Sequence, residues 1–518
     1  TTVSGSALSY NNSSSNGGDA DSAGDTDTYN FAISGLTAST AYQFRWASWK
    51  GTGTASGLGI DNLSFTAAIV SSQTGNWSNT ATWVGGVVPT SSQNAVIATG
   101  HTVTMDSDTY ATRSLGTTTV VNTGGTLLTN KNYINNGSTT INGSFQLDAG
   151  GWVSDIGGTN ALVYGTSGTL IFNTAYGANN GNYWPTTSGP VNVTVNTGST
   201  LTLGFARTVT GLLQTSSTIT NPGNITIGPN GTLQLNAGYG FSGTGSPVYG
   251  TASLLKYNSG GSPGRGAEWT QSAGTVGTTA GLPQNVQISN TTTLNFPNGS
   301  TAAFKANGNL TIDSGSALYQ NYSGGSAALI VGGNLVLNGS LGLGSSVGGD
   351  LFLAGNWTKA VAANFYPNDR AVEFNGSVAQ TITGDTTFDY LTLNNAAGLT
   401  LSSTTSSIIV NQKLTFTAGK ITLGANNLTV SSTGTISGND TSKYVVTNGT
   451  GQLKQTVGSA AVAFPVGSAT AYNPITFTNA GTSDVYGVIL TAGTVPNVSD
   501  ATLTVNDRWL VSEAVSGG

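Results

Sequence analysis

Short apolar-polar-apolar triplets, separated by turns that contain Gly or Asn, run along most of the chain. Asn224-Ile-Thr-Ile227 leads through Gly228-Pro-Asn-Gly231 into Leu233-Gln-Leu235. Gly308-Asn-Leu-Thr-Ile312 and Gly333-Asn-Leu-Val-Leu337 repeat the same order of Gly, Asn and alternating residues. Alternation over a few residues is typical of strands with one buried face, and no stretch has the i, i+3, i+4, i+7 spacing of an amphipathic helix. The pattern predicts an all-β protein.

The triplets recur at intervals of about 10 and about 20 residues between residues 115 and 440, which is typical of a solenoid. A strand of three or four residues is too short to bury a face by itself. We therefore predict a parallel β-helix, in which each inward Leu, Ile or Val lies over its equivalent one coil below. With neighbouring strands about 4.8 Å apart, about 15 coils would stack to about 70 Å.

Residues 1–68 have the longer alternating segments of a β-sandwich or jelly roll. Tyr29-Asn-Phe-Ala-Ile-Ser34 and Tyr42-Gln-Phe-Arg-Trp46 alternate, and Ile60-Asp-Asn-Leu-Ser-Phe65 is typical of a closing strand. Three strands are too few for a closed sandwich. We expect this segment to be the C-terminal part of such a module, with the first strands upstream of Thr1.

After about residue 441 the spacing changes again. Ala463-Phe-Pro-Val466, Asn473-Pro-Ile-Thr-Phe477 and Val485-Tyr-Gly-Val-Ile-Leu490 are typical of antiparallel strands in an Ig-like sandwich. The sequence therefore predicts three parts: a partial β-sandwich at 1–68, a parallel β-helix at 69–440 with an opening cap at 75–114, and an incomplete β-sandwich at 441–518.

Composition indicates a folded chain with little charge. Charged residues make up 7% of the 518 residues, whereas 37% are hydrophobic, which suffices for a core. The formal net charge of -6 argues against a nucleic-acid partner, which would call for a basic stripe. The chain has no cysteine, which excludes thiol catalysis, thiolate metal sites and disulfides. No apolar run reaches the length of a transmembrane helix.

Several motifs resemble a known family of exported proteins. Gly75-Asn-Trp-Ser-Asn-Thr-Ala-Thr-Trp83, followed by Gly100-His-Thr-Val-Thr104, resembles the opening of β-helical repeats in Bacteroidota surface proteins, which are typically exported by the type IX secretion system. Ala463-Phe-Pro-Val-Gly467 and Asn506-Asp-Arg-Trp509 resemble the module that follows these helices. Gly57-Leu-Gly-Ile-Asp-Asn-Leu-Ser-Phe65 resembles the last strand of a jelly-roll module in the same proteins.

The resemblance covers nearly the whole chain. It implies a large multidomain protein that is secreted or attached to the outer membrane, similar to the giant gliding adhesins of the SprB type and their relatives. The family includes adhesins and enzymes, and the shared motifs are structural. The resemblance therefore implies a location and an architecture, and it supplies no catalytic residue.

The densest group of carboxylates lies in the acidic segment before the first predicted strand. Closely spaced Asp side chains supply the oxygen ligands that Ca²⁺ prefers. The candidate calcium ligands are Asp19, Asp21, Asp25 and Asp27, with Asp61 on the closing strand. The alternative is a solvated acidic loop, and we expect no required cofactor.

The chain offers few residues for acid-base chemistry. His101 is its only histidine, which excludes a site with several histidines from this chain, and we interpret it as a packing or edge residue. Glycosidase chemistry needs two carboxyl groups about 5–10 Å apart. We expect no catalytic pair among the three pairs that lie close in sequence: Asp106 with Asp108, Asp369 with Glu373, and Asp385 with Asp389.

Two segments, residues 176–190 and 256–285, break the repeat and are expected to project from the β-helix as loops. Their aromatic residues Tyr183, Trp184 and Trp269 are candidates for stacking on sugar rings. The alternative is that these side chains pack against the β-helix.

Two short matches fit the Asp-Ser/Thr-small pattern that carries O-linked sugars in Bacteroidota. They are Asp21-Ser22-Ala23 and Asp385-Thr386-Thr387, which makes Ser22 and Thr386 candidate O-glycosylation sites. Three residues are a weak pattern in a chain this rich in Ser and Thr.

Together these observations favour a structural or adhesive segment of a large exported cell-surface protein over an enzyme. The β-helix would be a rigid spacer. Its uncharged Thr, Asn and Ser faces would contact a surface polysaccharide or neighbouring copies weakly but many times over, in an oligomer or fibre. The alternative is a polysaccharide-active enzyme or a carbohydrate-binding protein that uses the two predicted loops.

Overall fold

The computed structural model describes residues 68–154, 162–177, 182–320, 324–402, 407–493 and 507–515. The chain divides into two compact units, Thr1–Ser64 and Phe65–Gly518. Every described residue belongs to the second unit. The sandwich strands predicted up to Phe65 lie outside the described residues.

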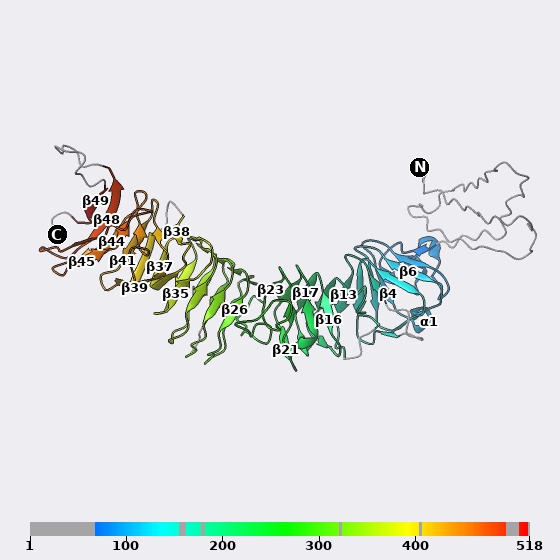
Figure 1. Ribbon diagram of the computed structural model, residues 1–518. Coiled ribbons are helices and arrows are strands. Elements are labelled where there is room, and N and C mark those ends of the chain that lie inside the picture. The colour runs from blue at the N-terminus through cyan, green and yellow to red at the C-terminus, as the bar shows by residue number, and fades with distance from the viewer. Residues whose placement is uncertain are drawn as a thin grey trace, which may run out of the picture. The chain divides into compact units, whose positions relative to one another are not determined.

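One parallel sheet, called the spine here, runs through the second unit (Figure 1). Its 18 strands pair in a single line, each in parallel with the equivalent strand of the preceding and the following coil. The unit is a parallel β-solenoid of about 17 turns, so the predicted parallel β-helix is confirmed. In chain order the spine strands are β2 (Gly75–Asn76), β4 (Thr102–Met105), β7 (Thr126–Thr129), β10 (Ser144–Leu147), β13 (Thr169–Phe172), β14 (Asn192–Val195), β17 (Leu212–Thr215), β20 (Thr232–Leu235), β23 (Leu254–Tyr257), β24 (Asn285–Ile288), β27 (Leu310–Ile312), β30 (Leu335–Leu337), β33 (Trp357–Lys359), β36 (Gln380–Thr383), β38 (Leu399–Leu401), β40 (Ile421–Thr422), β43 (Val445–Val446) and β46 (Val466–Gly467).

Residues at the same position of successive coils fill the interior. On the spine, Leu233 lies in register with Leu255 of the next coil, and Leu255 with Val286 of the coil after that. All three side chains are buried. Burying an aliphatic side chain of this size stabilises the fold by about 1.5–3 kcal/mol relative to leaving it exposed. The same inward column continues through Leu310, Leu335 and Trp357.

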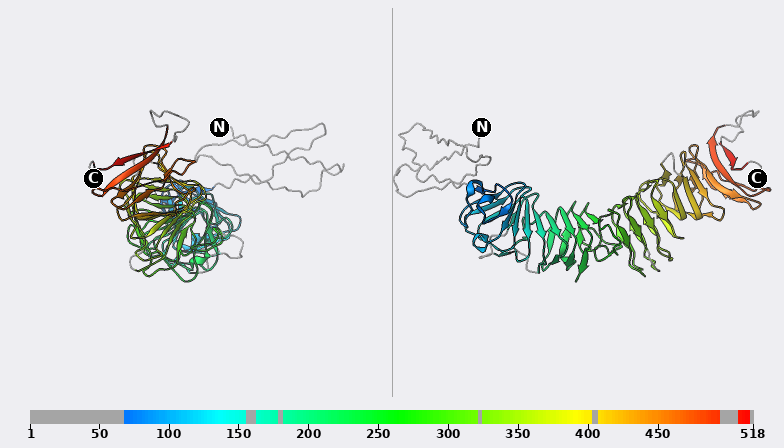
Figure 2. Two further views of the ribbon diagram at one scale, coloured as in Figure 1. Left: turned by 60° about the vertical axis from the view of Figure 1, so that its left-hand side comes forward. Right: turned by 180° about the vertical axis from the view of Figure 1, so that it is seen from behind.

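Shorter sheets form the other sides of the coils and replace one another along the chain (Figure 2). The first coils use β1 (Ile69–Val70), β3 (Ala95–Ile97), β6 (Thr118–Val121), β9 (Ser138–Ile141) and β12 (Val163–Tyr164), together with β5 (Thr112–Arg113), β8 (Asn132–Asn135) and β11 (Trp152–Ser154). The middle coils use β15 (Thr200–Thr202), β18 (Thr218–Thr220) and β21 (Gly240–Ser242), together with β16 (Arg207–Val209), β19 (Ile225–Ile227) and β22 (Val248–Tyr249).

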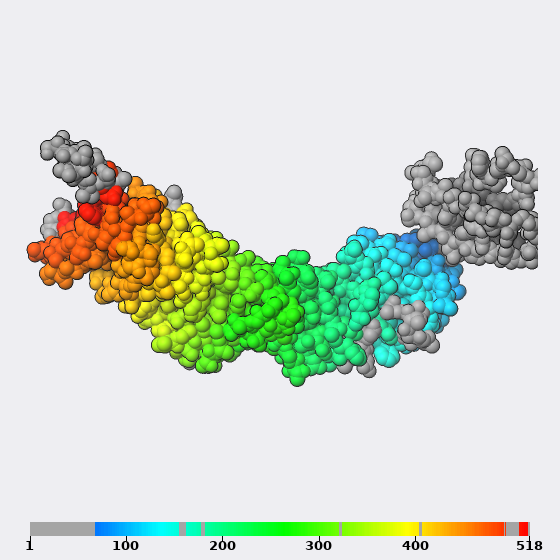
Figure 3. All heavy atoms as spheres, viewed as in Figure 1, coloured from blue at the N-terminus to red at the C-terminus, as the bar shows by residue number. Residues whose placement is uncertain are grey.

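The later coils use two sheets of unequal length. The shorter sheet, called the side sheet here, consists of β25 (Thr293–Asn295), β28 (Ala317–Tyr319), β31 (Ser340–Gly342) and β34 (Asn364–Tyr366). The longer sheet begins with β26 (Phe304–Ala306), β29 (Leu329–Val331), β32 (Leu351–Leu353), β35 (Ala371–Phe374), β37 (Thr386–Asn394), β39 (Ser407–Ala418), β41 (Asn427–Val430) and β42 (Thr435–Ser437). The helical elements among the described residues are α1 (Asp108–Ala111) and the 3₁₀ turns Thr80–Thr82, Val84–Gly86 and Pro222–Asn224. In the space-filling view the coils follow one another in chain order along the unit (Figure 3).

The aromatic residues of the opening motif pack together in the first coil. The rings of Trp77 and Trp83 meet edge to face with their centroids 4.7 Å apart, and the indole N–H of Trp77 donates to the carbonyl of Pro89 (3.0 Å). The guanidinium of Arg113 lies 5.3 Å from the centre of the Trp77 ring and donates to the carbonyl of Thr90 (2.8 Å). Both rings are buried, so they form part of the core in the first coil.

A ladder of asparagine side chains follows the spine at the position after Gly in the repeated motif. The Oδ1 of Asn309 accepts a hydrogen bond from the backbone N–H of Asn334, and the Oδ1 of Asn334 accepts one from the backbone N–H of Asn356 (2.8 Å each). Asn285 and Asn356 make the same contact to the coils that follow them. Each Asn therefore links its coil to the next, in addition to the hydrogen bonds between strands.

The glycines before Asn309 and Asn334 are required by close approach. A Cβ at Gly333 would lie 2.5 Å from the Oδ1 of Asn309, and a Cβ at Gly308 would lie 2.6 Å from the Oδ1 of Asn285. Both distances are below van der Waals contact, so a larger residue would displace the ladder. This explains why Gly and Asn occur together in the repeat.

The spine does not end at residue 440, where a separate sandwich was predicted to begin. β43 and β46 continue it in parallel to Gly467. Two antiparallel strands, β48 (Asp484–Ala492) and β49 (Asp507–Glu513), extend the longer sheet through β44 (Leu453–Val457), which is itself parallel to β41. In contrast, β45 (Val462–Phe464) and β47 (Ile475–Phe477) form a separate two-stranded sheet. Similarly, parallel pairing already starts with β1 and β2, so residues 75–114 belong to the winding.

The asparagine ladder predicts an asymmetric effect of two substitutions at one position. Asn334→Ala removes the acceptor for the N–H of Asn356 and is expected to lower the free energy of unfolding by about 0.5–1.5 kcal/mol. Asn334→Asp keeps an acceptor oxygen, as Asp350 does for the N–H of Ala371 (2.9 Å), and is expected to stay close to the wild type. Urea unfolding followed by circular dichroism measures both. Equal losses in the two variants would contradict the ladder.

Candidate functional site

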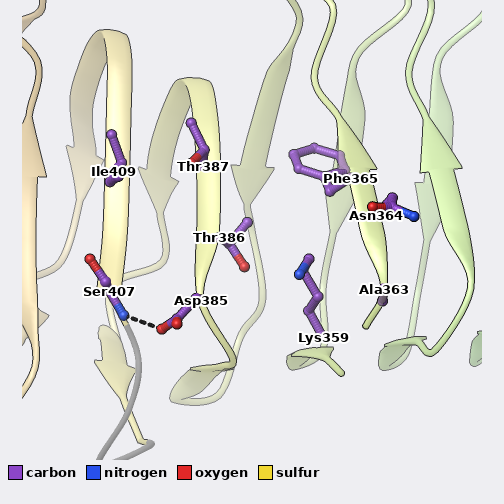
Figure 4. Close-up of a pocket in the computed structure, with 9 residues that line it drawn as sticks. All are labelled: Lys359, Ala363, Asn364, Phe365, Asp385, Thr386, Thr387, Ser407 and Ile409. Atoms are coloured by element: carbon purple, nitrogen blue, oxygen red, sulfur yellow. Dashed lines mark hydrogen bonds between the residues drawn. The ribbon is translucent and has the colours of Figure 1, made fainter. Parts of the chain in front are cut away.

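A hollow of about 420 Å³ opens on the surface beside the end of the side sheet (Figure 4). It is lined by residues from the end of β33 to the start of β39. They are Lys359, Ala363, Asn364, Phe365, Asp385, Thr386, Thr387, Ser407 and Ile409.

The hollow exists because the side sheet stops at β34. Among the described strands, β34 pairs with β31 and with no strand of a later coil. The next coil crosses this region with one nine-residue strand, β37, which pairs with β35 and β39. The free edge of β34 therefore faces the start of β37 without a hydrogen-bonded ladder, and the wall of the solenoid has a step there.

The floor of the hollow is aromatic and its rim is polar. The ring of Phe365 packs against Trp357 and Phe388, with centroid distances of 4.9 and 5.8 Å. Lys359 and Asp385 lie on the same side of the hollow, below the ring of Phe365 as Figure 4 is drawn. The hollow thus combines one aromatic ring with two charged groups of opposite sign.

The lining residues offer several groups that can bind a ligand, but they do not offer two carboxyl groups for catalysis. Asp385 is the one carboxylate among the nine lining residues, and its Oδ1 accepts the backbone N–H of Ser407 (2.6 Å). Hydrolysis of a glycosidic bond usually requires two carboxyl groups on opposite sides of the sugar. An aromatic floor with hydroxyl, amide and charged groups around it fits a small polar ligand such as a sugar ring.

Sequence analysis pointed to Asp385 and Thr386 in this region and missed Lys359, Asn364 and Phe365. One signal was available. From Thr386 to Leu393 the chain has no Gly or Asn to divide the strand, whereas the preceding coils have such a corner. A coil without this turn has one long strand in place of two shorter ones. The side sheet therefore gains no further strand in the described part of the chain, and the surface is recessed beside its last strand.

Thr386 is buried, which contradicts its proposed role in O-glycosylation. Its side chain is 3% exposed. Its Oγ1 accepts the indole N–H of Trp357 and donates to the carbonyl of Gly384 (3.1 Å each). The hydroxyl points inward because it occupies an inward position of β37, so the folded chain does not present it to a glycosyltransferase. The other candidate, Ser22, lies outside the described residues.

The three aromatic residues proposed for glycan contact are also buried. Tyr183, Trp184 and Trp269 are 4%, 1% and 0% exposed. Trp184 packs on Phe172 (centroids 6.3 Å apart), and the indole N–H of Trp269 donates to the carbonyl of Lys305 (2.9 Å). The interpretation as sugar-stacking residues is therefore wrong, and the alternative of packing against the β-helix holds.

The large aromatic side chains of these two segments point inward, because each segment takes the place of strands that a normal coil has. β13 is followed directly by β14 on the spine, and β23 directly by β24, with no strand of another sheet between them among the described residues. The large rings fill the volume that strand side chains occupy elsewhere. Their burial removes far more apolar surface from water than projection into solvent would.

The candidate calcium ligands, Asp19, Asp21, Asp25, Asp27 and Asp61, lie outside the described residues. Within the part of the chain that the structure describes, no group of three His, Asp or Glu residues is placed to hold a metal ion. The same part contains no helix that is long and apolar enough to cross a membrane.

The carboxylate pairs that are close in sequence bind polar groups of neighbouring coils. Asp106 accepts hydrogen bonds from the backbone N–H and the hydroxyl of Ser78 (3.0 and 2.5 Å). Asp389 accepts the backbone N–H of Asp369 (2.8 Å) and the side-chain amide of Asn411 (3.0 Å). In each case the carboxylate tethers one coil to another.

The single histidine is part of a similar tether. The Nδ1 of His101 lies 2.9 Å from the hydroxyl of Ser71, and that hydroxyl accepts the backbone N–H of Ala98 (2.9 Å). Ser71 is buried, so the pair links the first strand to the second coil.

A buried carboxyl group lies under the irregular segment between β23 and β24. Glu268 is fully buried, and one of its oxygens accepts hydrogen bonds from the hydroxyl of Tyr257 (2.8 Å) and the backbone N–H of Gly266 (2.7 Å). The other oxygen has no hydrogen-bond partner. Burial raises the pKa of Glu268 above its ordinary value, and the hydrogen bonds and the charge of Arg265 offset this in part.

No protein-family model, no curated protein and no solved structure matches the chain.

The burial of Trp184 predicts a stability effect. Trp184→Ala is expected to lower the free energy of unfolding by about 3–5 kcal/mol, because it leaves a cavity in the core. The control is Trp152→Ala, which removes a side chain that is 54% exposed and is expected to cost far less. The melting temperatures of both variants, measured by thermal unfolding, test this prediction. Similar melting temperatures would contradict a core role for Trp184.

The raised pKa of Glu268 predicts a pH dependence of stability. As the pH rises above about 4.5, this carboxyl ionises in the unfolded chain before it does in the folded one, so the folded state loses stability until the folded-state pKa is passed. Glu268→Gln is expected to remove this loss, which has a slope of up to about 1.4 kcal/mol per pH unit. Urea unfolding at a series of pH values measures it. Glu373→Gln, which leaves the Glu268 cluster intact, should keep the wild-type dependence.

Proposed function

We propose that residues 65–518 form a rigid spacer with an adhesive surface within a large exported cell-surface protein. The observation that carries the proposal is the unbroken spine of 18 parallel strands. Its 17 steps of about 4.8 Å extend over about 80 Å. A chain that devotes its core and its hydrogen bonds to stacking coils is suited to hold other modules apart.

The adhesive part of the proposal is supported by the neutral polar residues on the outer side of the strands. One outward row of the spine begins with Thr102, Thr126, Ser144 and Thr169, in register from coil to coil. Each position offers a hydroxyl group that binds weakly. Repetition over many coils, and over several copies at a surface, would convert weak contacts with a polysaccharide or with neighbouring copies into firm attachment.

An extracellular location at the outer membrane is proposed from the family resemblance of the opening and closing motifs. The absence of cysteine is compatible with this location. The type IX secretion system is the export route that the same resemblance implies.

A second candidate function is carbohydrate binding, which the hollow beside β34 favours. Its aromatic floor and its polar rim suit a sugar ring. A polysaccharide-active enzyme is less well supported, because the hollow supplies one carboxylate where hydrolysis usually needs two.

Rigidity is testable by distance measurements, since the chain has no cysteine and introduced cysteines can be labelled selectively. Thr102, Thr232 and Thr381 occupy one outward row, with six coil-to-coil steps between the first two and six between the last two. Pairs of nitroxide labels are expected to give narrow distributions near about 29 Å for each six-step pair. The outer pair is also expected to give a narrow distribution, at a distance shorter than the sum of the inner two because the solenoid bends (Figure 2).

Electron-electron double resonance on the full chain with Thr102→Cys/Thr232→Cys, Thr232→Cys/Thr381→Cys and Thr102→Cys/Thr381→Cys measures these distances. The two six-step pairs control for each other. Broad distributions would rule out a rigid spacer.

A further inference from the structure

One outward row of the side sheet carries two tyrosines around a glycine. Asn295, Tyr319, Gly342 and Tyr366 lie in register on β25, β28, β31 and β34. The ring centroids of Tyr319 and Tyr366 are 6.5 Å apart with an angle of 42° between the planes. Tyr366 is 46% exposed and Tyr319 is half-buried. The two rings form an aromatic platform at the surface.

Gly342 makes the platform possible. A Cβ at this position would lie 2.7 Å from Cδ1 and 3.2 Å from Cε1 of Tyr319, so the edge of that ring lies over the glycine backbone. The φ of Gly342 is not positive, so the backbone itself does not require glycine. The glycine therefore serves to let the Tyr319 ring lean toward Tyr366.

The platform is continuous with the hollow. Asn364 and Tyr366 point to the same outward side of β34, because side chains alternate along a strand. Asn364 also lines the hollow, beside Phe365. The surface thus passes from two tyrosine rings to an amide group and then to the polar rim that includes Lys359 and Asp385.

We propose that the platform and the hollow together form a binding site for a chain of a neutral polysaccharide. The flat apolar faces of pyranose rings stack on Tyr319 and Tyr366, and the rim of the hollow binds the hydroxyl groups of the next sugar. A neutral glycan is favoured over an acidic one because Asp385 offsets the charge of Lys359 and the whole chain carries a net charge of -6. This proposal rests on the proposed function, which includes contacts with a polysaccharide. It adds where on the solenoid the polysaccharide binds and that the polysaccharide is neutral.

The test is affinity electrophoresis of the full chain in gels that contain laminarin, xyloglucan or glucomannan, with polygalacturonate as the acidic comparison. At least one neutral polysaccharide is expected to retard the wild type. Tyr366→Ala and Tyr319→Ala are expected to weaken retardation at least about fivefold, since each removes one stacking surface. Tyr366→Phe keeps the ring and should bind as the wild type does.

Gly342→Ala is the sharper variant, because it adds a methyl group where the Tyr319 ring lies and removes no contacting side chain. It is expected to weaken binding to a similar extent. Trp152→Ala is the matched control, since it removes an exposed aromatic residue from a different sheet. It should leave retardation unchanged.

Several outcomes would overturn this site. They are no retardation by any neutral polysaccharide, retardation by polygalacturonate alone, and retardation that survives Tyr366→Ala and Gly342→Ala. Self-association in sedimentation experiments that Tyr366→Ala abolishes would assign the platform to a second copy of the chain and equally overturn the proposal. The label distances along the spine are measured separately. A chain that keeps those distances and binds no glycan would refute the site and leave the spacer intact.

Discussion

The structure depends on the register between successive coils. A strand of three residues, such as β27 or β30, buries too little apolar surface to be stable alone, and its backbone groups find partners only on the coils above and below. In-register stacking satisfies both needs at once. The hydrogen bonds fix the spacing, and this spacing places each inward aliphatic side chain over its equivalent. The asparagine ladder adds a third link between coils at the same spacing. A shift of the register by one residue would therefore disrupt the strand hydrogen bonds, the stacking of inward side chains and the asparagine hydrogen bonds together.

The most informative features lie where this register is interrupted, and the solenoid handles interruptions in two ways. Between β13 and β14, and between β23 and β24, large side chains of the irregular segments point inward, and Trp184 and Trp269 complete the core. At the end of the side sheet no segment fills the gap, and the free edge of β34 borders a hollow. The first solution leaves a closed wall. The second leaves a recess with exposed polar groups, next to the two tyrosines that the same side sheet presents.

Several charged residues in the described part of the chain link coils or pack against their core. Arg113 lies over the ring of Trp77, and Asp106 and Asp389 bind groups of neighbouring coils. Glu268 differs from these two carboxylates, because burial raises its pKa and one of its oxygens has no partner. A surface with so little charge has weak long-range electrostatic attraction. Recognition on it therefore relies on shape, stacking and hydroxyl contacts repeated along the coils.

The sequence by itself determined the class of fold. Triplets such as Leu233-Gln-Leu235 carry the alternation of a half-buried strand, and the recurrence of Gly-Asn before them sets the coil length. It did not determine where the winding stops, because alternation has the same period in parallel and antiparallel strands, and Val466 therefore read as part of a sandwich. It also did not determine which aromatic residues face solvent. Trp184 and Tyr366 are similar in sequence context. However, Trp184 fills the core of a coil that has no strand outside the spine among its described residues, whereas Tyr366 lies on the last strand of the side sheet. Only the tertiary structure decides this, because exposure depends on which strands of the neighbouring coils are present.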